Sequence, residues 1–409
     1  MFQPSPIQPP GAASPRAVSL YAAFDVFPRA KGSSSHIASM VQGLERAFGS
    51  VRLLCLGTPE MPAYQREGAI EIFRFRRRRR DLLTRATEFA RFVAGHVRAL
   101  RGGLRLAVFR DPWGGYPLLR SEPGCPCVFE VNALPSWELG YSRPGLAADP
   151  VLRAKLRDME RFCLRGARHV LCVSGVTRRA LMAEDVPGER VTVIPNVAHD
   201  AFFKAASLPC PIAALEEGEW CGYIGGLQAW QGVETLVDAF ARMAPDRPRT
   251  RLLILHGDTP RMLRAVERRV ARWGLDGRVL LHPPLDQQGV AGVLARLRFS
   301  AVPLADTPRN TVQGCCPVKL VESLAAGVPV VASDLAVNRE WVRDGEEGLL
   351  APPDDARAWA LALRRIFDDG PGRDRMAAAA RRRASETFSW RIVHEQLHNM
   401  FHYAANGGV

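Results

Sequence analysis

The residues best suited to chemistry lie in one stretch of the sequence, CCPVKLVESLAAGVPVVAS, residues 315–333. A helix that begins at Pro317 places Lys319 and Glu322 one turn apart on one face, close to its start. A helix amino terminus presents unpaired N–H groups to an anion, and Lys319 adds a full positive charge. Glu322, when ionised, accepts two hydrogen bonds and suits a vicinal diol such as a ribose. This face fits a diphosphate joined to a sugar, although a solvated Lys–Glu pair on an ordinary helix has the same spacing.

Two glycine-containing turns offer further anion sites. Gly225 and Gly226, in YIGGLQAWQGVETLVDAF, let backbone approach a ligand closely, and a helix is expected to begin near Gly232. A tight turn alone also explains such a pair of glycines. In the first half of the chain, KGSS at residues 31–34 precedes a helix expected from Ser35 and forms a counterpart on the opposite wall of a cleft.

Composition narrows the class of protein. The 409 residues suffice for two or three globular domains, and 55 Lys plus Arg against 42 Asp plus Glu give a net charge of +13, which favours an anionic partner. No apolar run is long enough to span a membrane, and residues 1–16 form a Pro-rich leader without the features of a secretory signal. Nine cysteines without a CxxC pair indicate buried thiols in a reducing cytoplasm rather than disulfides or a zinc ribbon.

The elements that must position these residues form two α/β domains. Short apolar runs alternate with segments of helical period, the pattern of parallel sheets with crossover helices. The predicted parts are a leader (1–16), a first doubly wound Rossmann-like domain (17–203), a linker (204–218), a second Rossmann-like domain (219–386) and a closing helix (387–409). Because ligands bind beyond the carboxyl ends of such strands, the cleft between the domains is the expected site.

Five segments together support a family resemblance. They are FPRAKGSSSH, VSGVTRRAL with VTVIPN, the glycine-rich turn before VETLVDAF, VKLVESLAAGVPVVAS, and REWVRDGEEGLLAPPDD. In order and spacing the chain resembles the retaining, nucleotide-sugar-dependent GT-B glycosyltransferases of family 4 from about residue 17 onward. The resemblance implies two facing Rossmann-like domains, with the donor held mainly by the second, the acceptor mainly by the first, and the last helix crossing back to the first domain.

The resemblance also implies which residues hold the donor. Glu322 matches the second Glu of the family's E-x7-E element, which binds the nucleotide ribose, and the backbone of Val318, Lys319 and Leu320 matches the part beside the diphosphate. Gly225 belongs to the donor-binding turn.

Three positions depart from the family pattern. Gly314 stands in place of the first Glu of that element, and Gly226 and Gln231 stand in place of the usual phosphate-binding Arg and Lys. A branch with P-x-K-x-x-E resembles this chain better. We therefore hypothesise that Lys319 supplies the charge that the missing pair would give.

For the transfer step, the resemblance implies a front-side mechanism in which the donor phosphate helps to take the acceptor proton. Asn132 falls where family members place a His beside the reacting sugar, and Glu130 precedes it by two residues on the same strand. Either side chain is a candidate partner of a sugar hydroxyl, although a strand-end turn also explains them. Gly32 and Ser33 are the candidate acceptor contacts. Since the sequence contains no D-x-D pair, we expect neither a metal nor another cofactor.

The sequence HEQLH, residues 394–398, satisfies the H-E-x-x-H pattern of zinc proteases. A third ligand is missing, because His402 lies two helical turns from His394, about 12 Å along the axis at 1.5 Å per residue. This segment is therefore interpreted as part of the closing amphipathic helix.

The densest charge run, Arg74 to Arg80, precedes a predicted basic amphipathic helix over 82–100. It favours an anionic membrane surface or merely solvated arginines, since no nucleic-acid-binding module accompanies it and no nucleic-acid partner is expected.

The predicted function is transfer of a sugar from a nucleoside diphosphate to a glycan or lipid-linked acceptor with retention, in envelope or exopolysaccharide synthesis. The expected location is the cytoplasm, with peripheral association at the inner membrane face. A non-catalytic binding or scaffold protein on the same fold is the main alternative, and an epimerase or phosphorylase of this architecture is another.

Overall fold

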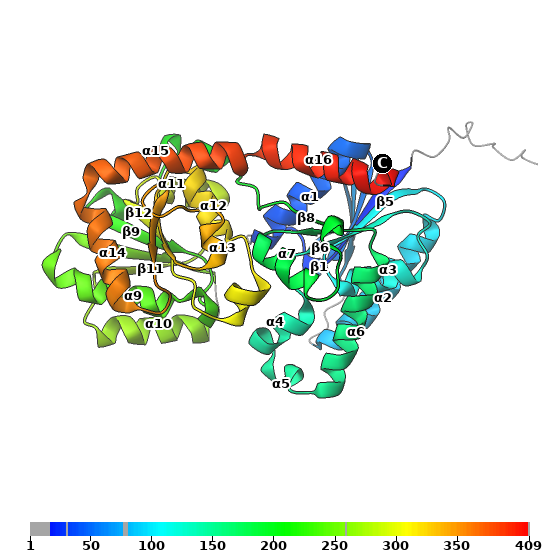
Figure 1. The fold of residues 1–409 in the computed structure, drawn as a ribbon, viewed down its shortest axis with the longest axis horizontal. Helices are drawn as coiled ribbons and strands as arrows, with labels where there is room; N and C mark the ends of the chain where they lie inside the picture. The colour runs from blue at the N-terminus through cyan, green and yellow to red at the C-terminus, as the bar shows by residue number, and fades with distance from the viewer. Residues whose placement is uncertain (1–16, 30–31, 77–80, 258–259, 408–409) are drawn as a thin grey trace, which may run out of the picture.

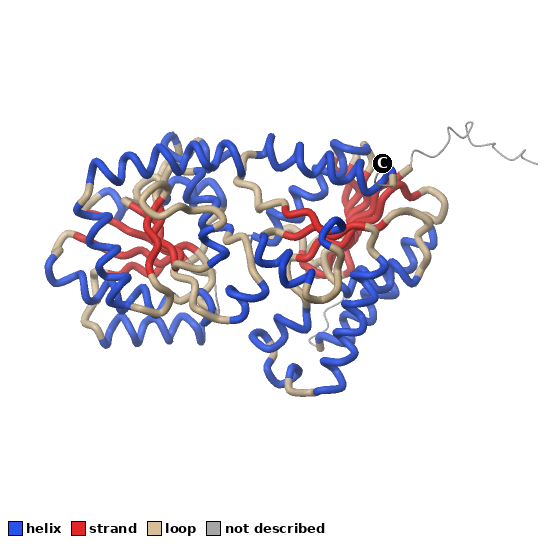
Figure 2. Tube along the Cα trace, viewed as in Figure 1, coloured by secondary structure: helices blue, strands red, loops and turns tan. Residues whose placement is uncertain are grey.

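The computed structural model describes residues 17–29, 32–76, 81–257 and 260–407, which form one mostly parallel and one parallel sheet, each covered by helices on both faces (Figure 1). Figure 2 shows the strands gathered into two separate groups with helices around each. Parallel strands require long crossovers, and both faces of such a sheet are buried, so strands such as VSLYAAFDV are almost continuously apolar.

The first sheet has eight strands in the order β3-β4-β2-β1-β5-β6-β7-β8. Its strands are β1 (Val18–Val26), β2 (Val51–Leu56), β3 (Tyr64–Glu67), β4 (Ile70–Phe75), β5 (Leu104–Phe109), β6 (Cys127–Val131), β7 (His169–Cys172) and β8 (Val191–Val193). Its helices are α1 (Gly32–Phe48), α2 (Leu82–Ala99), α3 (Pro112–Arg120), α4 (Pro135–Ser142), α5 (Pro144–Ala147), α6 (Pro150–Gly166) and α7 (Gly175–Met182). Helices α2, α3, α6 and α7 pack on one face of the sheet, and α1 packs on the other.

The second sheet has six strands in the order β11-β10-β9-β12-β13-β14, all parallel. They are β9 (Glu219–Ile224), β10 (Thr250–Leu255), β11 (Val279–His282), β12 (Phe299–Val302), β13 (Val330–Ser333) and β14 (Gly348–Ala351). The helices around it are α8 (Asp200–Phe203), α9 (Val233–Met243), α10 (Pro260–Arg272), α11 (Gln287–Leu294), α12 (Val318–Ala325), α13 (Ala336–Arg339), α14 (Ala356–Asp368) and α15 (Gly370–Thr387). Helices α11, α12 and α15 pack on one face, and α9, α10 and α14 on the other.

The last helix, α16 (Trp390–Asn406), leaves the second sheet and packs on α1 of the first. Figure 1 shows α15 and α16 running one after the other along a single edge of the molecule. The apolar face of α16 (Val393, Leu397, Met400, Phe401 and Ala404) shares a core with Ile37, Met40 and Val41 of α1. Helix α16 therefore packs on the first domain, whereas α15 directly before it packs on the second.

Most strands and helices lie where the apolar periodicity predicts them, and the differences have local causes. Helix α3, PWGGYPLLR, was not predicted because two prolines and two glycines favour a loop. Gly115 is needed there because a Cβ atom would lie 2.3 Å from the Phe109 ring. The antiparallel edge strand β3 is short, polar and exposed, so it lacks an apolar pattern. Within the predicted linker, Ile212 and Leu215 are buried in the core of the second domain.

Within the described part of the chain, none of the helices combines the length and the apolar character needed to cross a bilayer. The predicted leader over 1–16 lies outside the described residues.

Truncation of Phe401 tests how much α16 stabilises the first domain. We expect Phe401→Ala to lower the free energy of unfolding by about 3–5 kcal/mol, because the fully buried ring would leave a cavity between α16 and α1. Denaturant unfolding followed by tryptophan fluorescence measures the change. Glu395→Ala, on the exposed face of the same helix, is the control and should stay within about 0.5 kcal/mol of the wild type. An equally small effect for Phe401→Ala would contradict the packing.

Candidate active site

A cavity of about 330 Å³ lies between the two domains. It is lined from the first domain by the amino-terminal half of α1 and from the second by α11, α12 and the start of α16. The lining residues are Ser35, His36, Ala38, Gln42, Asn196, Val197, His199, Asp200, Gln287, Val318, Glu322 and Trp390. Val318 and Glu322, two of the predicted donor-binding residues, therefore line one cavity with residues of the opposite domain.

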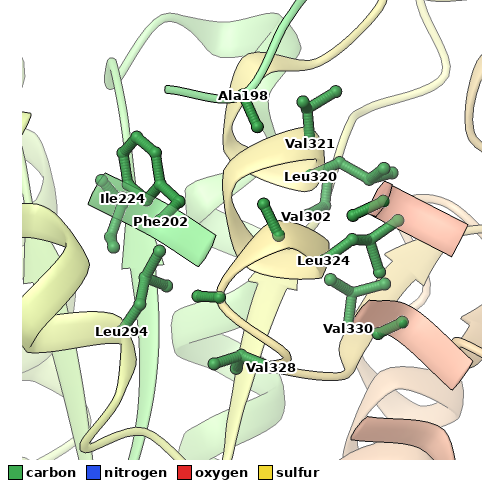
Figure 3. Close-up of a cluster of buried hydrophobic side chains, with 14 of the residues drawn as sticks. Ala198, Phe202, Ile224, Leu294, Val302, Leu320, Val321, Leu324, Val328 and Val330 are labelled. Carbon is green, nitrogen blue, oxygen red and sulfur yellow. The ribbon is translucent and has the colours of Figure 1, made fainter. Parts of the chain in front are cut away.

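Helix α12 is held at this cavity by its apolar face. Figure 3 shows Leu320, Val321 and Leu324 packed among buried side chains that include Val302 and Val330. Of the predicted donor contacts, Leu320 is fully buried, and its backbone N–H donates to the carbonyl of Pro317 at 3.0 Å, so the structure does not present it to a ligand. This packing leaves Glu322 on the side of the cavity.

Lys319 lies against the glycine-rich turn that follows β9. Its ammonium group donates to the hydroxyl of Tyr223 at 2.8 Å and to the side-chain oxygen of Gln231, and it lies 4.2 Å from the centre of the Tyr223 ring. A Cβ atom at Gly225 would come within 2.8 Å of the ammonium nitrogen. The absent side chain at this position thus makes room for Lys319. Its charge lies beside Gln231, where the family pattern has a lysine.

Glu322 lines the cavity, and among the described residues no side chain donates a hydrogen bond to its carboxyl group. Burial raises the pKa of its carboxyl to about 8, and the attraction of Lys319 offsets only part of this rise. A ligand that donates hydrogen bonds to the carboxylate would favour its charged form and lower its pKa. The position suits a diol, as the sequence predicts.

Glu130 differs from its predicted role because it is fully buried and both carboxylate oxygens are engaged. Tyr21 donates to Oε2 at 2.5 Å, Arg110 donates to Oε1 at 3.0 Å, and Nε2 of His36 lies 2.6 Å from Oε1. Burial opposes its charge, but His36 and Arg110 outweigh that cost and lower its pKa to about 2. The structure places Glu130 where it orients these neighbours and does not reach a substrate.

Asn132 lies just after β6, is half-buried and donates a hydrogen bond from its side-chain amide to Glu130.

Two residues that the sequence did not predict, His36 and Asn196, line the cavity, and their side chains lie 2.8 Å apart. Asn196 directly follows the predicted strand VTVIP, so its place after a strand end was the available signal. The signal for His36 was its place on the first turns of the helix after KGSS.

Gly314 stands where the family pattern has the first Glu of the E-x7-E element, and the local packing explains why this position is a glycine. Its φ of +78° is unfavourable for other residues, and a Cβ atom would lie 2.7 Å from the backbone nitrogen of Thr177. The segment therefore packs directly on the start of α7. Beside it, the carboxylate of Glu340 accepts hydrogen bonds from the backbone N–H groups of Gly175 and Val176, each at 2.9 Å. Both contacts join the second domain to α7 of the first.

The remaining predicted residues lie at the edges of this site. Gly226 follows Gly225 in the turn after β9, and its carbonyl accepts a hydrogen bond from Tyr223. Gly32 and Ser33 begin α1, whereas the residues of that helix that line the cavity start at Ser35.

The arginine run does not form one exposed surface. Arg74 is 4% exposed and donates to the carbonyls of Phe27 and Pro62 and to Gln65, so the prediction that it faces a membrane is wrong. Residues 77–80 of the run lie outside the described residues. The apolar residues of α2, among them Phe89 and Val93, face the core of the first domain. An apolar face of α2 is therefore not available to lipid.

The H-E-x-x-H segment lies in α16, as predicted. His394 contacts the Ser39 hydroxyl at 3.3 Å and stacks on Trp390, with ring centroids 3.9 Å apart. Among the described residues, no three His, Cys, Asp or Glu side chains are grouped so that they could hold a metal ion.

Solved structures share this arrangement over nearly the whole chain. Sucrose-phosphate synthase from Thermosynechococcus elongatus superposes with a TM-score of 0.75 at 20% identity, covering 94% of this chain and 98% of the other. Anabaena Alr3699/HepE in complex with UDP-glucose gives 0.71 at 15% identity, covering 94% and 99%. The glycosyltransferase WaaG gives 0.67 at 14% identity, covering 94% and 99%. The predicted GT-B fold is confirmed.

Family models match both domains. The one described as Glycosyltransferase Family 4 matches residues 30–200, and the one described as Glycosyl transferases group 1 matches residues 218–369. The chain belongs to the family 4 glycosyltransferases.

Curated relatives match part of the chain. A phosphatidyl-myo-inositol mannosyltransferase from Mycobacterium tuberculosis is 32% identical over 247 residues, 58% of this chain and 60% of the relative. A D-inositol 3-phosphate glycosyltransferase from Jonesia denitrificans is 31% identical over 179 residues, 42% of this chain and 40% of the relative. The matches thus span about half of the length of these relatives.

The raised pKa of Glu322 predicts a pH-dependent cost of folding. Between the usual pKa of 4.5 and about 8, the folded protein holds a proton that the unfolded chain has released, so stability falls as pH rises through this window. We expect the Tm of Glu322→Gln to match the wild type near pH 5 and to exceed it increasingly up to roughly pH 8 in melts without nucleotide.

The exposed Glu346 provides the control for this comparison. Glu346→Gln and the wild type should give parallel curves of Tm against pH. Parallel curves for Glu322→Gln as well would show that its carboxyl pays no desolvation cost.

Proposed function

We propose that this protein transfers a sugar from a nucleoside-diphosphate sugar to a glycan or lipid-linked acceptor, with retention of configuration. The observation that carries the proposal is the cavity between the domains, which Val318 and Glu322 of α12 line together with the first domain. The first turn of α12 and Lys319 offer N–H groups and a cation to a diphosphate, and Glu322 offers a carboxylate to a ribose. Membership of the glycosyltransferase family supports this reading.

In the proposed step, the bond between the anomeric carbon and the diphosphate oxygen breaks while a bond to the acceptor oxygen forms on the same face. The acceptor hydroxyl passes its proton to the departing diphosphate oxygen. Lys319 and the amino terminus of α12 stabilise the negative charge that develops there. Glu130, with both oxygens engaged, is not needed as a general base.

We further propose that the reaction requires no metal ion or other cofactor. The support is that Lys319 lies beside Gly225 and Gln231, where its charge can offset that of a diphosphate. Addition of EDTA to the binding assay below tests this part directly.

A panel of nucleotides tests the donor site. Among UDP, GDP, ADP and their hexose conjugates, we expect the ligands that carry one particular base to raise the Tm, because a ligand that binds only the folded state stabilises it. The rise in Tm should be the same in the presence of EDTA and of magnesium. Lys319→Ala should weaken the binding of that nucleoside diphosphate about 10- to 100-fold, because a charge-assisted contact is lost. The affinity for the parent nucleoside should stay unchanged.

Lys155→Ala, on the exposed face of α6, is the matched control and should bind like the wild type. Unchanged diphosphate affinity in Lys319→Ala would remove the role of Lys319. The absence of a Tm shift with any nucleotide would favour the second candidate function, a non-catalytic protein on this fold. That candidate rests on the three departures from the family's donor-binding pattern, at Gly226, Gln231 and Gly314.

The acceptor is proposed to be lipid-linked and the protein to lie in the cytoplasm at the inner membrane face. The mannosyltransferase relative is named for a phosphatidylinositol lipid, which supports a lipid acceptor. Because the apolar side of α2 is buried, any adsorption must use charges such as Arg91 and Arg98, which are exposed on this helix. Contacts of this kind are screened by salt.

Vesicle flotation tests the membrane surface. We expect binding to anionic but not to neutral vesicles, with release at high salt and a severalfold loss in the double variant Arg91→Glu with Arg98→Glu. The double variant Arg268→Glu with Arg272→Glu, on the exposed side of α10, carries the same charge change and should bind normally. Binding that ignores lipid charge, or no binding at all, would show that these arginines are merely solvated.

A further inference from the structure

A chain of polar contacts crosses from the first domain to the second beside the cavity. It begins at the buried pair of Arg110 and Glu130, whose Oε1 lies 2.6 Å from Nε2 of His36. Nδ1 of His36 lies 2.8 Å from the side-chain oxygen of Asn196. The side-chain amide of Asn196 donates to the carbonyl of Cys316 at 2.7 Å. The chain thus connects a buried charge of the first sheet to the residue two before α12.

The direction of each hydrogen bond in this chain is fixed. The carbonyl of Cys316 can only accept, so Asn196 must turn its NH2 group toward it and its oxygen toward His36. His36 therefore faces an oxygen with each ring nitrogen, the Asn196 side-chain oxygen at Nδ1 and a Glu130 carboxylate oxygen at Nε2. These contacts hold the His36 ring and the Asn196 amide each in one orientation between Glu130 and the carbonyl of Cys316.

The chain ends where a donor would bind. Cys316 precedes Pro317, the residue that caps α12, and Val318 is the first residue of that helix. His36 and Asn196 line the same cavity as Val318 and Glu322. The orientation of α12 relative to the first sheet is therefore set by residues that a ligand in this cavity would meet.

We propose that His36 and Asn196 are positioning residues that fix the amino terminus of α12 against the carboxyl edge of the first sheet. This inference rests on the proposed function, since its purpose is to hold a donor on α12 facing an acceptor on the first domain. The donor contacts themselves lie on the second domain, so the chain adds little to nucleotide affinity. It controls the distance between the reacting groups, and a misplacement of about 1 Å can slow a reaction about 100-fold.

Other contacts keep the domains together when this chain is broken. Gln287 donates to the Ser35 hydroxyl at 2.7 Å, and Glu340 accepts from the start of α7. Variants of His36 and Asn196 should therefore remain folded with the domains associated. The expected defect is in alignment rather than in folding.

A double-mutant cycle tests the proposal with the full chain. We expect His36→Ala and Asn196→Ala each to lower kcat for donor turnover about 10- to 100-fold while the Kd of the nucleoside diphosphate changes less than about threefold. The double variant should lower kcat no further than either single variant, because either change breaks the same chain. Additive losses in kcat, or a loss of nucleotide affinity at unchanged kcat, would overturn the proposal.

Two further variants serve as a second test and as a control for this double-mutant cycle. Asn196→Asp keeps an acceptor for His36 but loses the donor to Cys316, so it should behave like Asn196→Ala; wild-type kcat in this variant would contradict the chain. His402→Gln, on α16 and outside the cavity, is the matched histidine control and should retain wild-type kcat.

A readout without turnover separates this proposal from the proposed function. The same cycle is measured on Tm in the absence of nucleotide, where the losses for His36→Ala and Asn196→Ala should again be less than additive when combined. If the wild type binds no nucleotide, the proposed function fails, but a non-additive Tm cycle would still support the coupling of His36 to Asn196. Additive changes in Tm would overturn the chain even in an active enzyme.

Discussion

A buried carboxylate keeps its charge only when cations and donors replace the water it has lost, and Glu130 imposes that constraint on the first domain. The sheet order places β1, β5 and β6 side by side, which brings Tyr21 and Arg110 to this carboxylate. His36 completes the set from α1 on one face of the sheet. The start of α1 is therefore fixed relative to the strand ends, and this start forms one wall of the cavity.

In the second domain, glycine positions and one lysine stand where the family pattern has charged side chains that bind the donor. Gly225 leaves room for Lys319, and Gln231 accepts a hydrogen bond from the ammonium group. Gly314 brings its segment against the start of α7, where a glutamate would collide with Thr177. The departures are thus mutually consistent. Lys319 on α12 contacts Gln231 and is linked through the Tyr223 hydroxyl to the carbonyl of Gly226, and Gly314 has become a packing contact between domains.

Much of this architecture could be predicted because buried parallel strands and amphipathic helices leave strong periodic signals, as in the strand at 51–56 and the helix at 150–166. The placement of Val318 and Glu322 also followed from a proline and a helix start. What periodicity cannot supply is contact between distant segments. His36, Asn196 and Cys316 are far apart in the sequence, and only the fold brings them together.

The same limit explains the residues whose exposure was misjudged. Arg74 and Glu130 are charged, and charge alone predicts a surface or a ligand contact. Carbonyl oxygens surround Arg74, and the Arg110 and His36 side chains surround Glu130, so both charges are satisfied inside the protein. These partners come from loops and strands whose meeting depends on sheet order and not on local composition.

The path of α16 has a consequence for the order in which the protein folds during synthesis. One face of the first sheet is covered by α1, and α16 completes that layer with Leu397 and Phe401. Residues 390–406 leave the ribosome only after the second domain has been made. The apolar stripe of α1 that α16 covers therefore stays exposed while the second domain is synthesised and folds. During that time this surface of α1 is a site where the nascent chain can aggregate.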